Sequence, residues 1–339
     1  IKLEAVSRVS NNKIPNEAKV HRGLVGKAGI QNVLFAGPTP THNVLVLEPL
    51  GNSLESLLNK QNNKKLSLKT VLTLGDQMLS LLEYVHGRGF IHRNISLQNF
   101  AMGFAPESKQ LYLTEFGHAK RYLDPKTKVH VPYRDRRPVD VQSVMYLSVN
   151  AHNGIEQARR DDIESLCYVL IHLLKGDLPW LDIKSHTSEE VRRKVRERKA
   201  AVTPNELCQG IPTEFAQMLS YARGMFYDHK PDYKMLHSLM RTLFLKSGYS
   251  PDFVFDWTSP AVAAERQGNS RFLSATPDLQ TPEISPAQSE APSENGDAAE
   301  QAPSVAEIVI STPVKPGAEK KKKQTTGCAS LFSCFARAS

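Results

Sequence analysis

The sequence contains few cysteines, and their spacing marks neither a metal site nor a redox site. The four are Cys167, Cys208, Cys328 and Cys334. They form no CxxC pair and none of the regular patterns of a disulfide-stabilised secreted domain. The eleven histidines likewise show no HExxH spacing, so we expect no structural metal ion. The lack of a disulfide pattern among the cysteines indicates a reducing compartment.

Long apolar runs are also absent. No stretch is long enough to cross a bilayer, and no charged-then-apolar secretory leader opens the sequence. The net charge is +8, yet zinc-finger spacing and a basic stripe interleaved with aromatic residues are both missing. Nucleic acid is therefore not an expected partner. We expect a cytoplasmic protein.

Composition divides the chain into a folded part and a tail. From residue 259 onward the sequence is rich in serine, proline, alanine and glutamate and is nearly free of aromatic residues. Such a segment cannot bury enough apolar surface to offset the entropy of its chain. We therefore expect residues 259–339 to be disordered.

Two runs in the folded part have the patterns of β-strands. The run "NVLVLE" (43–48) is apolar and rich in β-branched residues, which is typical of a buried strand. The run "QLYLTEF" (110–116) alternates between apolar and polar residues, as a half-buried strand does.

Longer apolar patterns downstream predict helices. One helix is predicted to follow Ser67, a suitable N-cap, and to stop at Gly87 or Gly89. Residues 161–176 are apolar nearly all round and open with two aspartates, which predicts a core helix. Strands followed by a mainly helical body indicate an α+β fold with two lobes.

Several motifs of the chain resemble those of the casein kinase 1 family of protein kinases. The matching segments lie between residues 2 and 257 and include "IKLE", "LEPLGNSLESLL", "FIHRNISLQNFAMG", "NGIEQARRDDIESLCYVL" and "HKPDY". The resemblance implies a two-lobed protein-kinase fold of the α+β class, with a truncated N-terminal β lobe, a mainly helical C-terminal lobe and a disordered tail. Residues 1–48 would be the remainder of the small lobe, 49–258 the large lobe and 259–339 the tail. It also implies a glycine-rich loop upstream of Ile1.

The resemblance assigns a nucleotide pocket to the first fifty residues. Lys2 in "IKLE" corresponds to the lysine that holds the nucleotide's phosphates, and Glu17 in "PNEAK" to the carboxylate that pairs with it. In "LEPLG" the backbone groups of Glu48 and Leu50 would bind adenine. Pro49, which lacks an N–H, falls where no donor is required. ATP with Mg²⁺ is therefore the cofactor to test.

Three positions that supply the chemistry in this family depart from its pattern. Asn94 stands where an aspartate accepts the proton of the attacking hydroxyl, and a neutral amide cannot act as a base. Ser96 stands where a lysine stabilises the phosphoryl charge. Glu115 replaces the metal-binding aspartate and moves its carboxylate out by one methylene, while Asn99 remains as the second metal ligand. A lost general base alone costs roughly 10²–10⁴-fold in rate, so the resemblance implies a pseudokinase that signals through protein partners or nucleotide.

The alternative is a weakly active serine/threonine kinase in which another carboxylate replaces the missing aspartate. The substrate region also departs from the family, because Met145 and Ala200 replace an arginine and a lysine of its anion pocket. By contrast, Asp162 resembles the aspartate that holds the backbone of the catalytic loop, and it is present. The basic run "VRRKVRERK" (191–199) predicts a solvated helix face or a site for an acidic partner.

The end of the chain combines a basic block with two cysteines. Lysines 320–323 precede Cys328 and Cys334, which lie among apolar and small residues, while Ala336 stands where a prenylation box requires cysteine. Two acyl chains, or one chain beside a polybasic patch, anchor a protein stably to a membrane. The segment therefore predicts S-acylation and attachment to an anionic membrane such as the inner face of the plasma membrane. Nuclear import through the lysines and an inert tail are the alternatives.

Overall fold

The computed structural model of the protein describes residues 1–6, 13–105, 108–135 and 144–274, with side chains to residue 267. The chain divides into two compact units, Ile1–Asp278 and Leu279–Ser339, and all described residues belong to the first. The predicted acylation sites, Cys328 and Cys334, lie outside the described residues. Within the described ranges, no helix combines the length and the hydrophobicity needed to cross a bilayer.

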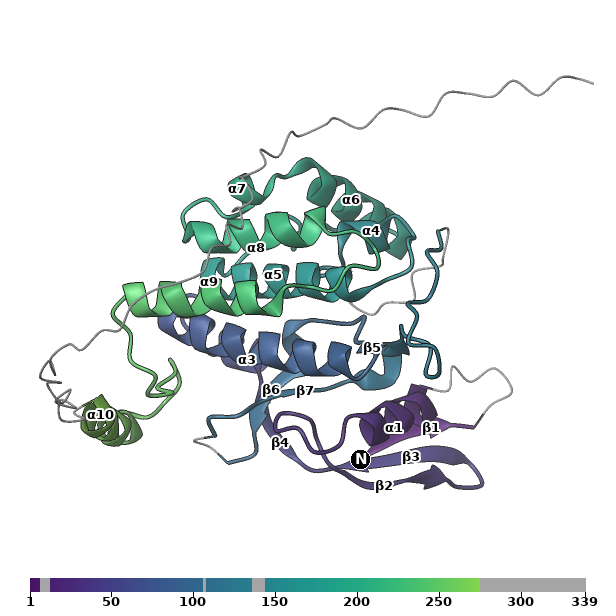
Figure 1. Ribbon diagram of the computed structural model, residues 1–339, viewed down its shortest axis with the longest axis horizontal. Coiled ribbons are helices and arrows are strands. Elements are labelled where there is room, and N and C mark those ends of the chain that lie inside the picture. The colour runs from purple at the N-terminus through teal and green to yellow at the C-terminus, as the bar shows by residue number, and fades with distance from the viewer. Residues whose placement is uncertain (7–12, 106–107, 136–143, 275–339) are drawn as a thin grey trace, which may run out of the picture. The chain divides into compact units, whose positions relative to one another are not determined.

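A three-stranded antiparallel sheet and one helix form the N-terminal part of the molecule (Figure 1). Strand β3 (His42–Leu47) lies between β1 (Lys2–Ala5) and β2 (Val33–Pro38). It confirms the strand predicted for 43–48. Helix α1 (Lys13–Gly23) packs on this sheet. A small apolar core lies between helix and sheet and consists of Ile14, Ala18 and Leu45.

Two further sheets lie where the N-terminal part meets the helical part. One has the order β4 (Leu50–Ser53), β6 (Phe100–Gly103), β7 (Leu111–Leu113), and all its strands are antiparallel. The other pairs β5 (Phe90–Ile91) with β8 (Lys120–Arg121). These short strands hold in place the loops that carry most of the predicted site residues.

The C-terminal part is built mainly from helices. Helix α3 (Leu68–Gly87) packs against α5 (Arg159–Lys175) and α9 (Tyr233–Lys246), and α5 also packs against α8 (Thr213–Gly224) (Figure 1). The other helices and 3₁₀ turns are α2 (Leu54–Asn59), η1 (Leu97–Asn99), η2 (Phe116–His118), α4 (Val149–His152), α6 (Ser188–Ala201), α7 (Pro204–Leu207) and α10 (Pro260–Ser274).

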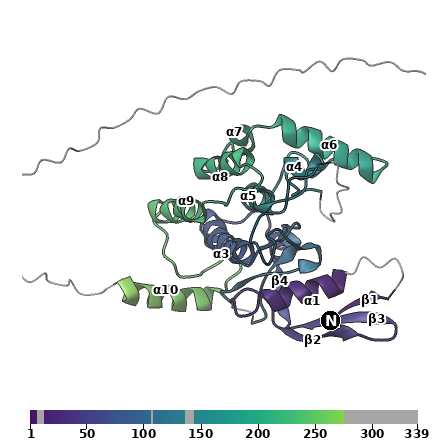
Figure 2. The same ribbon diagram turned by 45° about the vertical axis from the view of Figure 1, so that its right-hand side comes forward.

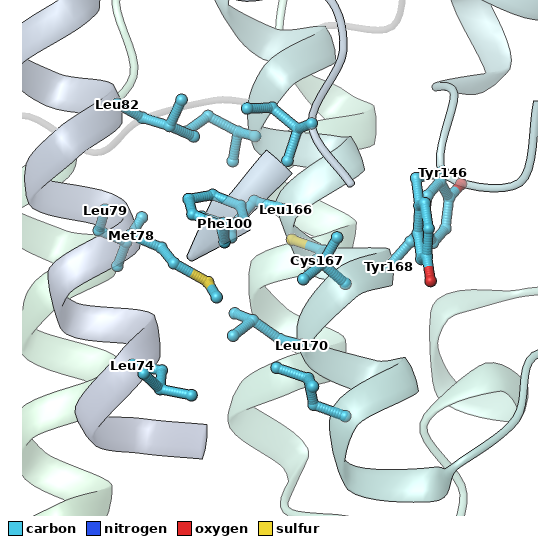
Figure 3. Packing of buried hydrophobic residues seen from close by; sticks show 14 of the residues in the cluster. Leu74, Met78, Leu79, Leu82, Phe100, Tyr146, Leu166, Cys167, Tyr168 and Leu170 are labelled. Carbon is cyan, nitrogen blue, oxygen red and sulfur yellow. The ribbon is translucent and has the colours of Figure 1, made fainter. Parts of the chain in front are cut away.

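The main hydrophobic core lies between α3 and α5. Figure 3 shows apolar side chains of the two helices pointing toward one another, among them Leu74, Met78, Leu79, Leu82, Leu166, Cys167 and Leu170. Helix α5 is buried on nearly all sides, as its sequence predicts. Both cysteines in the described residues, Cys167 and Cys208, are buried free thiols.

The boundaries of α3 follow from its end residues. The side chain of Ser67 caps the helix by accepting a hydrogen bond from the N–H of Thr70 at 3.3 Å. The helix ends at Gly87, as predicted, and Gly89 adopts a positive φ of 83° just beyond it. The strand predicted for 110–116 is shorter than expected because it ends at Leu113.

Helix α10 lies inside the segment that we expected to be disordered. Disorder does not begin at residue 259, because Pro260–Ser274 is helical. Proline suits the first turn of a helix, since its φ is already helical and the missing N–H would have no partner there. The alanine-rich sequence after it favours helix. Arg266 ties the helix to the preceding loop by donating to the carbonyl of Phe253 at 2.6 Å.

Candidate functional site

Three charged side chains from separate parts of the chain meet beside strand β1. The Nζ atom of Lys2 is 2.8 Å from Oε1 of Glu17 and 2.5 Å from Oε1 of Glu115. The packing of α1 on the sheet places Glu17, and the turn after β7 places Glu115. Glu17 is buried, whereas the side chain of Glu115 is 46% exposed. The ammonium of Lys2 therefore lies between two carboxylates.

Burial and mutual attraction set the protonation of this cluster. Burial opposes the charge of Lys2, but attraction from Glu17 and the hydrogen bond to Glu115 outweigh it and raise the pKa of the ammonium. Burial raises the pKa of Glu17, and Lys2 opposes this rise. Behind Glu17, burial and the charge of Lys2 lower the pKa of His21 to about 4. At neutral pH Lys2 is therefore charged and His21 is neutral.

Helix α1 is also bonded to the turn that carries Glu115. The side-chain amide of Asn16 donates to the carbonyls of Gly117 and Ala119, both at 3.0 Å. The N–H of Phe116 donates to Oε1 of Glu17 at 3.2 Å. This role of Asn16 was not predictable from the sequence, because it depends on the direction of two backbone carbonyls about a hundred residues away.

The catalytic-loop segment is held by Asp162 at the start of α5. Its carboxylate accepts hydrogen bonds from the backbone N–H groups of His92, at 2.7 Å, and of Arg93, at 2.8 Å. Within the loop, the side-chain amide of Asn99 donates to the carbonyl of Asn94 at 2.8 Å. Asn94 itself is buried. The loop thus has the backbone support that the resemblance implies, and the amide of Asn94 stands where the resemblance places the base.

Two further side chains support Asp162. Nε2 of His86, on α3, is 2.8 Å from Oδ2 of Asp162, and Nδ1 of His86 contacts the hydroxyl of Tyr233 on α9. Burial favours the protonated acid, but the hydrogen bonds from His86 and from the loop N–H of His92 keep the pKa of Asp162 below its ordinary value. Helices α3, α5 and α9 therefore all fix the loop.

Ser96, Asn99 and Glu115 occupy the other positions expected to serve the phosphoryl group and the metal. Ser96 is buried before the turn η1, and its side chain makes no capping bond there. The N–H of Thr114 donates to the carbonyl of Asn99 at 2.9 Å, which places Asn99 beside the turn of Glu115. The backbone of Glu115 is left-handed, with φ 64°.

The oxygen donors of this region suit Mg²⁺ only together with a nucleotide. The side-chain nitrogen of Asn99 donates a hydrogen bond to the carbonyl of Asn94. The side-chain oxygen of Asn99 is therefore the group that could bind a cation, together with the carboxylate of Glu115. Protein sites commonly bind Mg²⁺ through one or two such groups plus substrate phosphates. In the described part of the chain, no group of three or more His, Cys, Asp or Glu could hold a metal ion.

The adenine-binding segment expected at Glu48 and Leu50 follows strand β3. The N–H of Glu48 donates to the carbonyl of Asn32 at 3.1 Å, and its carbonyl accepts from Nε2 of Gln31 at 2.8 Å. Leu50 opens β4, opposite Gly103 in β6. Adenine would therefore share the Glu48 carbonyl with Gln31.

Lys199 of α6 contacts the backbone on both sides of Met145. Its Nζ donates to the carbonyls of Val144 at 3.1 Å and Leu147 at 2.7 Å, on either side of Met145. Ala200, which we expected at the position of the family's lysine, is exposed.

Comparison with known families agrees with this geometry. A family model for the protein kinase domain matches residues 1–235. The match covers well over half of the chain and includes the N-terminal sheet, the Lys2–Glu17 pair, the catalytic loop and the turn of Glu115. The chain therefore belongs to the protein kinase domain family.

Proposed function

We propose that this kinase-fold protein is a casein kinase 1-like pseudokinase that acts in signalling by binding protein partners or nucleotide. The proposal rests on one observation: Asn94 stands at the expected position of the catalytic base. The loop around it is fixed by Asp162, yet the side chain at the position of the base is an amide that cannot take a proton near neutral pH. The backbone of the loop is therefore held in place, while the residue at the expected position of the base cannot take the proton.

The neighbouring positions support the same conclusion. Ser96 is a short, uncharged and buried side chain where the phosphoryl group requires a cation. Glu115 contacts Lys2, which is the residue expected to hold the nucleotide's phosphates. Phosphoryl transfer depends mainly on positioning and on electrostatic stabilisation, and all three positions weaken one or the other.

The second candidate function is that of a weakly active serine/threonine kinase. The Lys2–Glu17 ion pair at 2.8 Å favours it, because active kinases require this pair. The family generally uses ATP and Mg²⁺. In this chain Lys2 would hold the phosphates, and Asn99 with Glu115 would hold the metal. ATP would then supply the γ-phosphate for transfer to a protein hydroxyl.

A transfer assay with the purified full-length protein tests the choice. We expect turnover on casein-type substrates at least about 10²-fold below the roughly 1–100 s⁻¹ of ordinary kinases. The triple variant Asn94→Asp/Ser96→Lys/Glu115→Asp should be more active than the natural chain, because it restores the base, the cation and the shorter carboxylate. Ordinary turnover by the natural chain would contradict the proposal. No gain in the triple variant would show that function has been lost at further positions.

A further inference from the structure

Helix α6 carries two sets of basic residues that differ in their partners. On one side, Arg193 pairs with Glu197 at 2.9 Å and Lys194 with Glu190 at 3.1 Å, both in exposed i,i+4 pairs. A different set, Arg192, Arg196 and Lys199, follows the helical spacing i, i+4, i+7 and so shares one face.

Within the described ranges, the first two arginines of this face lack compensating charge. Arg192 and Arg196 are half-buried, and neither has an acidic partner in the described part of the chain. Nε of Arg192 is buried without a hydrogen-bond partner among these residues. A buried donor that has lost water and gained no partner costs free energy. The arrangement therefore favours a bound group that accepts hydrogen bonds and carries negative charge.

The same face of α6 packs against α4. Figures 1 and 2 both show the two helices side by side. Val195 and Lys199, on this face, are fully buried. At the end of α4, His152 is 5% exposed, and neither of its ring nitrogens has a hydrogen-bond partner in the described residues. The carbonyl of Val144 lies near the ring but outside hydrogen-bond geometry.

The cations of this face of α6 act on the imidazole of His152. Burial lowers the pKa of this imidazole to about 3, and the charges of Lys199, Arg192 and Arg196 contribute in the same direction. Burial holds the pKa of Lys199 well below its ordinary value, although Glu164 attracts its charge, and two backbone carbonyls accept hydrogen bonds from its Nζ. Among the described residues the two arginines have no such partner, so they give the region around His152 a positive potential.

We propose that His152, Arg192 and Arg196 form a binding site for a phosphate dianion between α4 and α6. Guanidinium groups bind phosphate oxygens through two parallel N–H bonds, and two of them match the charge of a phosphate monoester, about −1.5 to −2 at neutral pH. The imidazole adds one more donor. Met145 and Ala200 are not part of this site, so it differs from the anion pocket that the chain lacks.

Phosphate of this kind has two sources, a free phosphate compound or a phosphorylated side chain of a partner protein. This proposal rests on the proposed function in one respect: it names the chemistry of a partner that the protein would bind. Its test uses neither ATP nor phosphate transfer, so an active kinase and a pseudokinase would give the same result. Failure of one proposal is therefore distinguishable from failure of the other.

Calorimetric titration of the full-length protein at low ionic strength, with inorganic phosphate and with a phosphoserine peptide, tests the site. We expect binding of phosphate, and we expect Arg192→Gln and Arg196→Gln each to weaken it by roughly tenfold, since each removes charge-assisted hydrogen bonds. Arg193→Gln is the matched control: it removes the same charge from the same helix, and it should change affinity less than twofold. Ring resonances of His152 should shift on binding, and unchanged melting temperatures should show that the variants are folded.

The two ligands separate the sources of phosphate. Tighter binding of the phosphoserine peptide than of inorganic phosphate and of the unphosphorylated peptide would support a phosphorylated protein partner. Equal binding of phosphate and phosphopeptide would support a free phosphate compound. The proposal is overturned if the natural chain binds neither, or if Arg193→Gln weakens binding as much as the other two substitutions.

Discussion

At the scale of single residues, Glu115 shows how one methylene changes a site. A left-handed backbone at φ 64° and the longer side chain bring its carboxylate to 2.5 Å from Nζ of Lys2. The ammonium is then shared with Glu17, which lies at 2.8 Å. A nucleotide's phosphates would have to compete with Glu115 for Lys2. Because Glu115 is 46% exposed, water and salt screen this pair, and the competition is modest.

We therefore expect Glu115→Gln to strengthen the binding of metal-free ATP by roughly two- to fivefold, the size expected for a partly exposed ion pair. The variant removes a negative charge beside the phosphates and releases Lys2 from one partner. Thermal shift with ATP and a chelator, across a range of ATP concentrations, measures the change. Glu189→Gln, on the exposed surface of α6, removes the same charge and should have no effect. Unchanged or weaker binding in Glu115→Gln would contradict the prediction.

Some contacts at this scale are predictable from the sequence, and others are not. The resemblance paired Lys2 with Glu17, and the structure brings them together. It did not indicate the contact of Glu115 with Lys2, because that contact depends on a left-handed backbone that a non-glycine residue rarely adopts. The resemblance did not indicate the hydrogen bonds of Asn16 either. Their acceptors are backbone carbonyls, which every residue type has, so the amino-acid sequence carries no signal for them.

At the scale of elements, α1 is held against the turn η2 by groups of the protein itself. Asn16 makes two hydrogen bonds to the carbonyls of Gly117 and Ala119. The ring of His21 meets the ring of Phe116 edge-on, with centroids 5.1 Å apart. The position of the corresponding helix controls activity in protein kinases. In this chain these contacts bind the helix to the turn η2.

Asn16→Ala should loosen this element. The substitution removes both hydrogen bonds and leaves two carbonyls without their donor, which we expect to cost about 1–2 kcal/mol in the free energy of unfolding. Amide hydrogen exchange should rise in α1 and η2 more than in α3 or α5. Lys19→Ala, an exposed position on the same helix, is the control and should change neither quantity. Unchanged protection of α1 in Asn16→Ala would show that other contacts suffice to hold the helix.

Element boundaries were predictable where a local signal fixes them. The N-cap at Ser67 and the stop at Gly87 define α3 from sequence, because capping depends on residues next to one another in the chain. The strand predicted for 110–116 was too long, since the alternating pattern continues past the residue where the backbone turns. Helix α10 was missed because its short alanine-rich sequence precedes a long segment of different composition.

At the scale of the whole molecule, three buried histidines make the free energy of unfolding depend on pH. His21, His92 and His152 lie in α1, the catalytic loop and α4, and all three are buried. Burial lowers each pKa, to about 4 for His21 and about 3 for His152. The unfolded chain takes up protons at these residues near pH 6.5, and the folded chain does so only at lower pH. Their contribution to stability is complete above about pH 6.5 and is lost as the pH falls.

We therefore expect the protein to lose stability between pH 7.5 and 5.5, by roughly 1 kcal/mol each for His21 and His152. Urea denaturation across this range measures the loss. His21→Leu should reduce the dependence on pH, because leucine keeps apolar contact with Phe116 and cannot be protonated. His186→Gln, which changes an exposed histidine, should leave the pH dependence as it is. Equal slopes in the natural chain and in His21→Leu would mean that His21 is protonated in the folded state as readily as in the unfolded one, and its burial against Phe116 would then not exclude the charge.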